Sequence, residues 1–202
     1  MTRRGFTLTE VMVSASLLSL VTGMLLLIYA QATRLSRQTD EQASMVADAQ
    51  VGIAVLKQAV REGTYSGLTP ATESFAVISP KAEDGEVELQ DDGRSILWGS
   101  YRVFWRDSEA GRILRRIVEI PELSDQRLAD LPIESFDSGG GPQTLPFYFD
   151  EGRVLMKNVT VFEIAPDDAL ELIELRIVLE APARRGPKPT TLEFLVTERC
   201  RN

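Results

Sequence analysis

Apolar residues fill positions 11–30, a run of twenty that only Ser, Thr and Gly interrupt. As an α-helix, a run of this length spans about 30 Å, which is the thickness of the hydrocarbon core of a bilayer. The pattern therefore predicts a transmembrane helix. Glu10 stands immediately before the run. A carboxylate costs roughly 2.5–3.5 kcal/mol at mid-membrane and less near the edge. An isolated anchor has no use for this charge, so the position of Glu10 indicates a partner.

The helical pattern continues beyond the predicted membrane segment. No proline occurs before Pro70, and apolar residues recur at helical spacing while charged and amide side chains fill the other faces. This apolar stripe consists of Met45, Val46, Ala49, Ile53, Leu56 and Val60. Gly63 follows Glu62 as a stop signal, because glycine adopts the left-handed conformation that ends helices. We predict one helix over residues 6–62, about 80 Å long, whose stripe packs on a globular head.

Residues 63–202 predict that head, and its pattern is rich in strands. Pro70, Pro80 and the charged stretch 81–85 indicate an irregular entry. Apolar and polar residues then alternate as in half-buried strands. The predicted strands lie at 101–106, 112–120, 145–149, 153–156, 159–164, 173–179 and 191–196. Asp150-Glu151-Gly152 predicts a hairpin turn, and residues 123–143, with Gly139-Gly140-Gly141, predict a long loop. The fold class is α+β: a long N-terminal membrane-spanning helix packed on a C-terminal antiparallel β-sheet domain.

The first residues carry a recognisable motif, Arg3-Arg4-Gly5-Phe6-Thr7-Leu8-Thr9-Glu10-Val11. It resembles the N-terminus of type IV prepilins and type II secretion pseudopilins: a short basic leader that ends in Gly, then Phe-Thr-Leu-x-Glu, then an apolar helix. The resemblance implies that residues 1–5 are a leader and that prepilin peptidase, an aspartyl membrane peptidase, cuts between Gly5 and Phe6. It also implies N-methylation of Phe6, and pairing of Glu10 with the N-terminal amine of a neighbouring subunit.

The order of helix, variable loop and antiparallel sheet is similar to that of minor pilins and pseudopilins. Residues 154–162 followed by 173–177 resemble the J-type pseudopilins and the PilW-like minor pilins. This resemblance implies a structural minor subunit of a type II secretion pseudopilus or a type IV pilus, in its tip or initiation complex. Its partners would be other minor and major pilin-like subunits, met through the N-terminal helix. The tip-most pseudopilin subunit typically lacks the glutamate, so Glu10 argues for a position below it.

The same residues permit three other interpretations. A secretory signal peptide would end at Ala30-Gln31-Ala32, although its apolar region is usually only about 7–15 residues long. The paired Arg3 and Arg4 also occur in twin-arginine signals. A plain single-pass anchor would keep Arg3 and Arg4 in the cytoplasm, although Arg34 and Arg37 weaken that asymmetry. The corresponding functions are an exported soluble binding domain and a monomeric membrane-anchored adhesin or receptor. The pilin-like interpretation instead places the chain in the bacterial inner membrane with a periplasmic head.

Composition narrows the function classes further. The chain has 202 residues, which fits one membrane rod and one domain, and its net charge is −8. An acidic head is a poor match for nucleic acid. The basic stretch 184–188 has the pattern of a solvated hairpin loop. The chain contains no histidine, so imidazole-dependent catalysis is absent and we expect no enzyme activity and no catalytic residue.

No cofactor or metal is expected from the pattern of possible ligands. The carboxylate pairs Asp91-Asp92, Asp150-Glu151 and Asp167-Asp168 stand at expected turns, where acidic residues are common, and no spaced calcium loop is present. Cys200 is the single cysteine, so it cannot form a disulfide within the chain. Its position near the end predicts an unremarkable tail residue.

Overall fold

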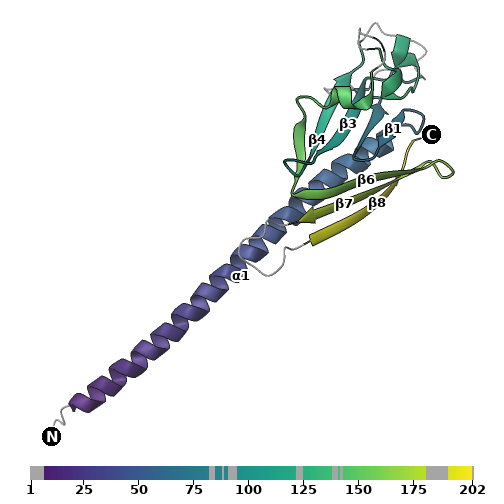
Figure 1. The fold of residues 1–202 in the computed structure, drawn as a ribbon. Helices are drawn as coiled ribbons and strands as arrows, with labels where there is room; N and C mark the ends of the chain where they lie inside the picture. Colours follow the sequence, from purple (N-terminus) through teal and green to yellow (C-terminus); the bar gives the residue numbers. More distant parts are fainter. Residues whose placement is uncertain are drawn as a thin grey trace. The chain divides into compact units, whose positions relative to one another are not determined.

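The computed structural model describes residues 7–81, 85–87, 89–90, 95–121, 125–137, 141, 143–180 and 191–201. The chain divides into two compact units, Met1–Ser44 and Met45–Asn202. One helix, α1 (Leu8–Glu62), contributes to both units (Figure 1). Its bounds lie within two residues of the predicted ones. Gly63 follows its last residue, where a Cβ would lie 2.1 Å from Cγ2 of Val77, so only glycine fits beside that strand.

The second unit contains two antiparallel sheets, so the α+β fold class is confirmed. The larger sheet has the order β1-β2-β3-β4-β5 and the smaller one the order β6-β7-β8 (Figure 1). The strands of the larger sheet are β1 (Leu68–Ala71), β2 (Ser74–Ser79), β3 (Ser100–Asp107), β4 (Arg112–Glu119) and β5 (Arg153–Lys157). Those of the smaller sheet are β6 (Val159–Asp167), β7 (Leu172–Glu180) and β8 (Thr191–Arg199).

The predicted irregular entry near Pro70 is wrong, because β1 and β2 form a hairpin there. β1 is an edge strand of its sheet, where proline is tolerated because its missing N–H can face solvent. β2 is buried at all six positions and therefore does not alternate between apolar and polar residues. A short strand buried on both faces lacks the period-two signal on which the prediction depended.

The predicted hairpin at residues 145–156 is also wrong. Leu145–Tyr148 forms a 3₁₀ helix (η3), and β5 pairs with β4 rather than with residues 145–149. Pro146 explains the difference, since its fixed φ suits the first turn of a helix and it has no N–H for a strand ladder. The predicted long loop contains two further 3₁₀ helices, η1 (Asp125–Leu128) and η2 (Ile133–Ser135). Gly139 and Gly140 lie outside the described residues.

The stripe of α1 enters a core that the two sheets share. Ala49, Leu56 and Val60 are completely buried among residues from both sheets. Phe75 of β2 stacks on Phe104 of β3 with ring centroids 4.9 Å apart, and it contacts Phe162 of β6 at 6.3 Å. The interpretation of the stripe as core packing is therefore confirmed.

A second core covers the opposite face of the larger sheet. Tyr101 and Val103 of β3 pack there against Ile133, Phe136 and Leu145, which belong to the region of the 3₁₀ helices. The side chains of β3 alternate between the two cores, as strand geometry requires. Ile133, Phe136, Leu145 and Tyr148 thus form a packed cover for the sheet.

Ion pairs attach the C-terminal end of α1 to the head. Glu198 of β8 accepts two hydrogen bonds from Arg61, at 2.8 and 3.0 Å, and lies 3.2 Å from Nζ of Lys57. Glu62 is paired with Lys81 at 2.6 Å and with Arg102 at 2.8 Å. Burial raises the pKa of each carboxyl, but these partners outweigh it and hold both pKa values below the ordinary 4.5. Both glutamates are therefore anionic near neutral pH.

Candidate assembly segment and head-domain sites

Glu10 closes the first turn of α1 together with Thr7. The backbone N–H and the hydroxyl of Thr7 both donate to Oε2 of Glu10 at 3.0 Å, and the backbone N–H of Glu10 donates to Oγ1 of Thr7 at 3.4 Å. This reciprocal arrangement is a capping box, which satisfies backbone donors that a helix start otherwise leaves free. Sequence reasoning assigned Glu10 only to assembly. The spacing Thr-x-x-Glu before an apolar run is the signal that could have found Thr7.

Among the described residues of its unit, the apolar run of α1 has no packing partner. Its large apolar side chains from Val11 to Tyr29 are 51–72% exposed. By length and composition α1 is able to cross a membrane. Exposed apolar surface of this extent suits lipid or other helices rather than water. The helix therefore provides a membrane anchor or a helix-packing surface.

Hydroxyl groups within the apolar run are satisfied by the helix itself. Ser16, Ser19 and Thr22 each donate to the carbonyl oxygen four residues earlier, at 2.8–2.9 Å. No hydroxyl of these three residues therefore needs water, which a bilayer core does not supply. Ala30, Gln31 and Ala32, the residues of the alternative signal-peptide site, lie inside α1. Gly5 and Phe6 lie outside the described residues.

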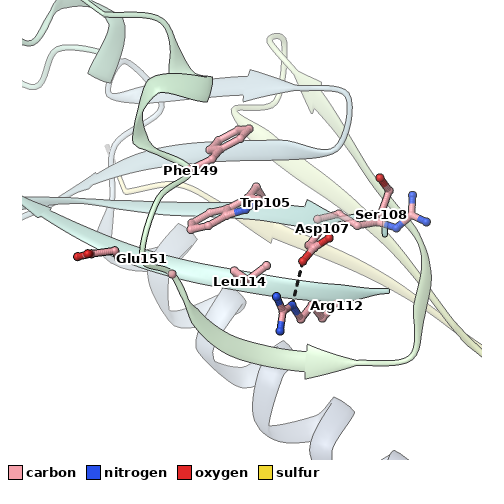
Figure 2. Close-up of a pocket in the computed structure, with 9 residues that line it drawn as sticks. Trp105, Asp107, Ser108, Arg112, Leu114, Phe149 and Glu151 are labelled. Atoms are coloured by element: carbon pink, nitrogen blue, oxygen red, sulfur yellow. Dashed lines mark hydrogen bonds and ion pairs between the residues drawn. The ribbon is translucent and has the colours of Figure 1, made fainter. Parts of the chain in front are cut away.

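A polar groove lies on the head near the turn between β3 and β4 (Figure 2). It has a volume of about 490 Å³ and is lined mainly by Trp105, Arg106, Asp107, Arg112 and Phe149. The rings of Trp105 and Phe149 are stacked, with centroids 5.2 Å apart. The charged groups already have partners in the chain: Arg112 pairs with Asp107 at 3.0 Å, and Arg106 pairs with Glu73.

The groove offers no obvious reactive group. The backbone N–H of Ala110 donates to Asp107 and, together with Arg112, lowers the pKa of this carboxyl against the effect of burial. A carboxyl held in its anionic form by a turn and an arginine is poorly suited to proton transfer near neutral pH. The groove is therefore best explained as the end of the β3–β4 hairpin, where the ion pair between Asp107 and Arg112 joins the two strands.

The described members of the carboxylate pairs at expected turns mostly accept hydrogen bonds from backbone N–H groups of those turns. Oδ1 of Asp150 accepts from the backbone N–H of Glu151 at 2.9 Å, and Oδ1 of Asp167 accepts from Ala169 at 3.0 Å. Asp168 accepts from the hydroxyl of Tyr65. Asp91-Asp92 lies outside the described residues. Within the described part of the chain, no group of three or more His, Cys, Asp or Glu could hold a metal ion.

Cys200 was predicted to be an unremarkable tail residue, but it is part of the core. It is only 4% exposed and belongs to the core that α1 shares with the sheets. Its backbone N–H donates to the carbonyl of Glu171, and burial raises the pKa of its thiol to about 11. A buried thiol of this kind behaves as a small apolar side chain.

Comparison with protein families gives one match, the prokaryotic N-terminal methylation motif, over residues 1–26. The match includes Gly5, Phe6 and Glu10 and ends within the apolar run. No curated protein and no solved structure matches the chain. The match supports the resemblance of the N-terminus to type IV prepilins, and with the apolar helix it supports membrane anchoring of a pilin-like structural subunit. The head lies outside the matched residues.

Proposed function

We propose that this protein is a minor pilin or pseudopilin, a structural subunit of a type II secretion pseudopilus or a type IV pilus. The observation that carries the proposal is the methylation-motif match at residues 1–26, joined to an apolar helix whose side chains are exposed. The motif without an exposed apolar helix would leave the subunit no surface through which to pack into a fibre. A helix of this kind without the motif would be an ordinary anchor.

In this proposal, prepilin peptidase removes residues 1–5 and Phe6 becomes the methylated N-terminus. The subunit stays in the bacterial inner membrane with its head in the periplasm until the apolar helix enters the fibre. There it packs against the helices of other minor and major pilin-like subunits. The resemblance to J-type and PilW-like subunits favours the tip or initiation complex, and Glu10 favours a place below the tip-most subunit.

Among the described residues, one carboxylate oxygen of Glu10 is left for this role. Both hydrogen bonds from Thr7 end on Oε2, and in the described part of the chain no donor contacts Oε1. The carboxylate can therefore keep its helix cap and still accept the ammonium group of a neighbouring subunit's Phe6. In a low-dielectric fibre core, two such charges attract strongly, and loss of one strands the other.

The first test is the mass of the N-terminus of the membrane-extracted protein, measured intact and on peptides. We expect a chain that begins at Phe6 and carries one additional methyl group. A start near Thr33 would identify a signal peptide and an exported soluble binding domain. An uncut Met1 would identify a plain anchor, as in a monomeric adhesin or receptor. Either of these two results would overturn the proposed function.

Substitutions at Glu10 separate its two contributions. Glu10→Gln keeps an acceptor for the Thr7 N–H, since capping boxes accept glutamine, but it removes the charge. We expect Glu10→Gln and Glu10→Ala to reduce fibre incorporation to a similar extent, and Thr7→Ala to reduce it far less. If Glu10→Gln incorporated as well as the unmodified chain, Glu10 would be a helix cap only. Incorporation is measured by the amount of subunit in sheared or detergent-isolated fibres.

A further inference from the structure

Three arginines from three different strands lie on one face of the larger sheet. Arg115 of β4 is directly opposite Arg153 of β5, and on its other side it is opposite Phe104 of β3. Arg102 lies two residues from Phe104 and therefore points to the same face. These three residues, Arg102, Arg115 and Arg153, are called the arginine cluster below. They are 13 or more residues apart in the sequence, so the cluster exists only in the folded sheet.

The positive charge of the cluster is only partly compensated. Arg102 has a carboxylate partner, Glu62 of α1, at 2.8 Å. In the described part of the chain, no carboxylate contacts Arg115 or Arg153. Arg115 is partly buried, and its pKa is lowered first by this burial and then by the charges of Arg102 and Arg153. Like charges directly opposite each other on neighbouring strands destabilise a sheet.

Several other arginines of the head have acidic partners, whereas Arg116 donates to the carbonyl oxygen of Tyr148 at 3.4 Å. Arg176 pairs with Glu163 at 3.0 Å and with Glu193 at 2.7 Å, and Arg61 binds Glu198 with two hydrogen bonds. The chain contains 30 acidic residues against 22 basic ones, so potential partners are abundant. Arg115 and Arg153 thus stand opposite each other without a carboxylate although acidic residues are abundant, and a carboxylate from outside the chain would relieve the repulsion between them.

The cluster is open to such a ligand. Arg153 is exposed, and its strand, β5, is the last strand of the larger sheet in the described part of the chain. No neighbouring strand covers the outer side of β5 there. Arg102, the member of the cluster that already has a partner, binds the carboxylate of Glu62. Guanidinium groups bind carboxylates through two parallel hydrogen bonds, and such pairs are among the strongest in proteins.

We propose that the arginine cluster docks a segment of a neighbouring fibre subunit that presents Asp or Glu side chains to Arg115 and Arg153. The proposal rests on the proposed function, which supplies the neighbouring subunit, and it names a contact on the head in addition to the helix contact. The incoming carboxylates relieve the repulsion between the two guanidinium groups. This contact gives the head selectivity for an acidic partner, because a basic or neutral surface leaves the repulsion in place.

The test uses the full-length protein in the membranes of its host and a carbodiimide, which joins an amine to a carboxylate in direct contact. The substitution R153K supplies an amine within the cluster. We expect peptide mass spectrometry to find position 153 joined to an Asp or Glu of another subunit that carries the N-terminal methylation motif. R176K is the matched control, and it should join Glu163 or Glu193 of the same chain.

The same crosslinking experiment can also contradict the docking proposal. If position 153 of R153K joins only carboxylates of its own chain, or none, while R176K gives its expected product, the docking proposal is wrong. The intact mass of the same sample reports on the proposed function separately. A methylated chain that begins at Phe6 leaves that function standing even when the crosslink fails, whereas an uncut chain overturns it.

A second measurement excludes a purely structural role. The partner subunit that the R153K crosslink identifies should co-isolate with the unmodified chain. The double variant R115Q/R153Q should lower the amount of this subunit that co-isolates by about tenfold or more, whereas R176Q should leave the amount unchanged. The melting temperature of R115Q/R153Q should not fall, because the substitution removes repulsion. A lower melting temperature would assign the arginines to folding. Loss of binding to phosphatidylglycerol vesicles with unchanged co-isolation would assign them to lipid. Either result overturns the proposal.

Discussion

The two halves of α1 share one backbone geometry and differ in what their apolar side chains contact. In the first unit Leu26 is 64% exposed, and in the second unit Leu56 is completely buried between the sheets. The first half is apolar nearly all round, whereas the second half carries one stripe. A leucine therefore stabilises the head in the second half of α1, whereas in the first half it is available to lipid or to other helices.

Removal of a buried leucine from the second half of α1 should have the largest effect. We expect Leu56→Ala to lower the free energy of unfolding of the head by about 3 kcal/mol, because a cavity opens in the shared core. Leu26→Ala is the matched substitution on the exposed half and should change it by roughly zero. Chemical denaturation of the full chain in detergent micelles measures both. Equal losses for the two variants would contradict the division of α1 into a core half and an exposed half.

Substitution of one glycine in each half of α1 tests the same difference in packing. A Cβ at Gly52 would lie 2.3 Å from Cγ of Met156, whereas a Cβ at Gly23 would have no atom within 4 Å. We expect Gly52→Ala to destabilise the head by about 1–3 kcal/mol through overpacking. Gly23→Ala should be neutral, or should stabilise the helix by up to about 1 kcal/mol. Thermal unfolding followed by near-ultraviolet circular dichroism distinguishes them, and a destabilising Gly23→Ala would reveal a contact on the first half.

Acid should affect the second half through Glu62 and Glu198. Their pKa values in the folded head lie below the ordinary value of 4.5, which also describes the unfolded chain. The stability that they contribute is therefore present above about pH 4.5 and is lost as the pH falls through the folded values. We expect a flat melting temperature from about pH 7 to about pH 5 and a decline below. Glu198→Gln should remove about 1 kcal/mol near neutral pH and make that decline shallower. An unchanged pH profile in this variant would contradict the role of the Glu198 pairs.

The smallest effect is expected at the first turn. Thr7→Ala removes the cap and should cost about 0.5–1 kcal/mol of local helix stability. The head should melt at the same temperature, because Thr7 belongs to the first unit. Hydrogen exchange at the amides of residues 8–11 should become faster in this variant, while exchange in β3 stays the same. Faster exchange in both places would show that the two halves of α1 are coupled.

Some features of this protein could be predicted from local sequence. The motif from Arg3 to Val11, the apolar run at 11–30 and the stripe that includes Ala49 and Leu56 consist of residues close together in the chain. Helix hydrogen bonds join residues four apart, so the pattern that forms α1 can be recognised without knowledge of distant segments. The α+β class followed from the change of period after Gly63.

The head depended on contacts that the local pattern does not contain. β2 was missed because both of its faces are buried, residues 145–149 were assigned to a strand although Pro146 favours a 3₁₀ helix, and Cys200 was placed in a tail although it lies in the core. The basic stretch 184–188, which stood out in the sequence, lies outside the described residues. The arginine cluster was not apparent, since register alone brings Arg115 opposite Arg153.

The long helix, its division into an apolar half and a striped half, and the N-terminal motif could be recognised from the sequence, because each depends on neighbours along the chain. Only the tertiary structure shows which strands pair, what lies on each face of the larger sheet and which arginines of the described residues lack a carboxylate partner. Pairing between distant strands sets these features, and a shift of one residue in register would turn Arg115 to the opposite face of the sheet.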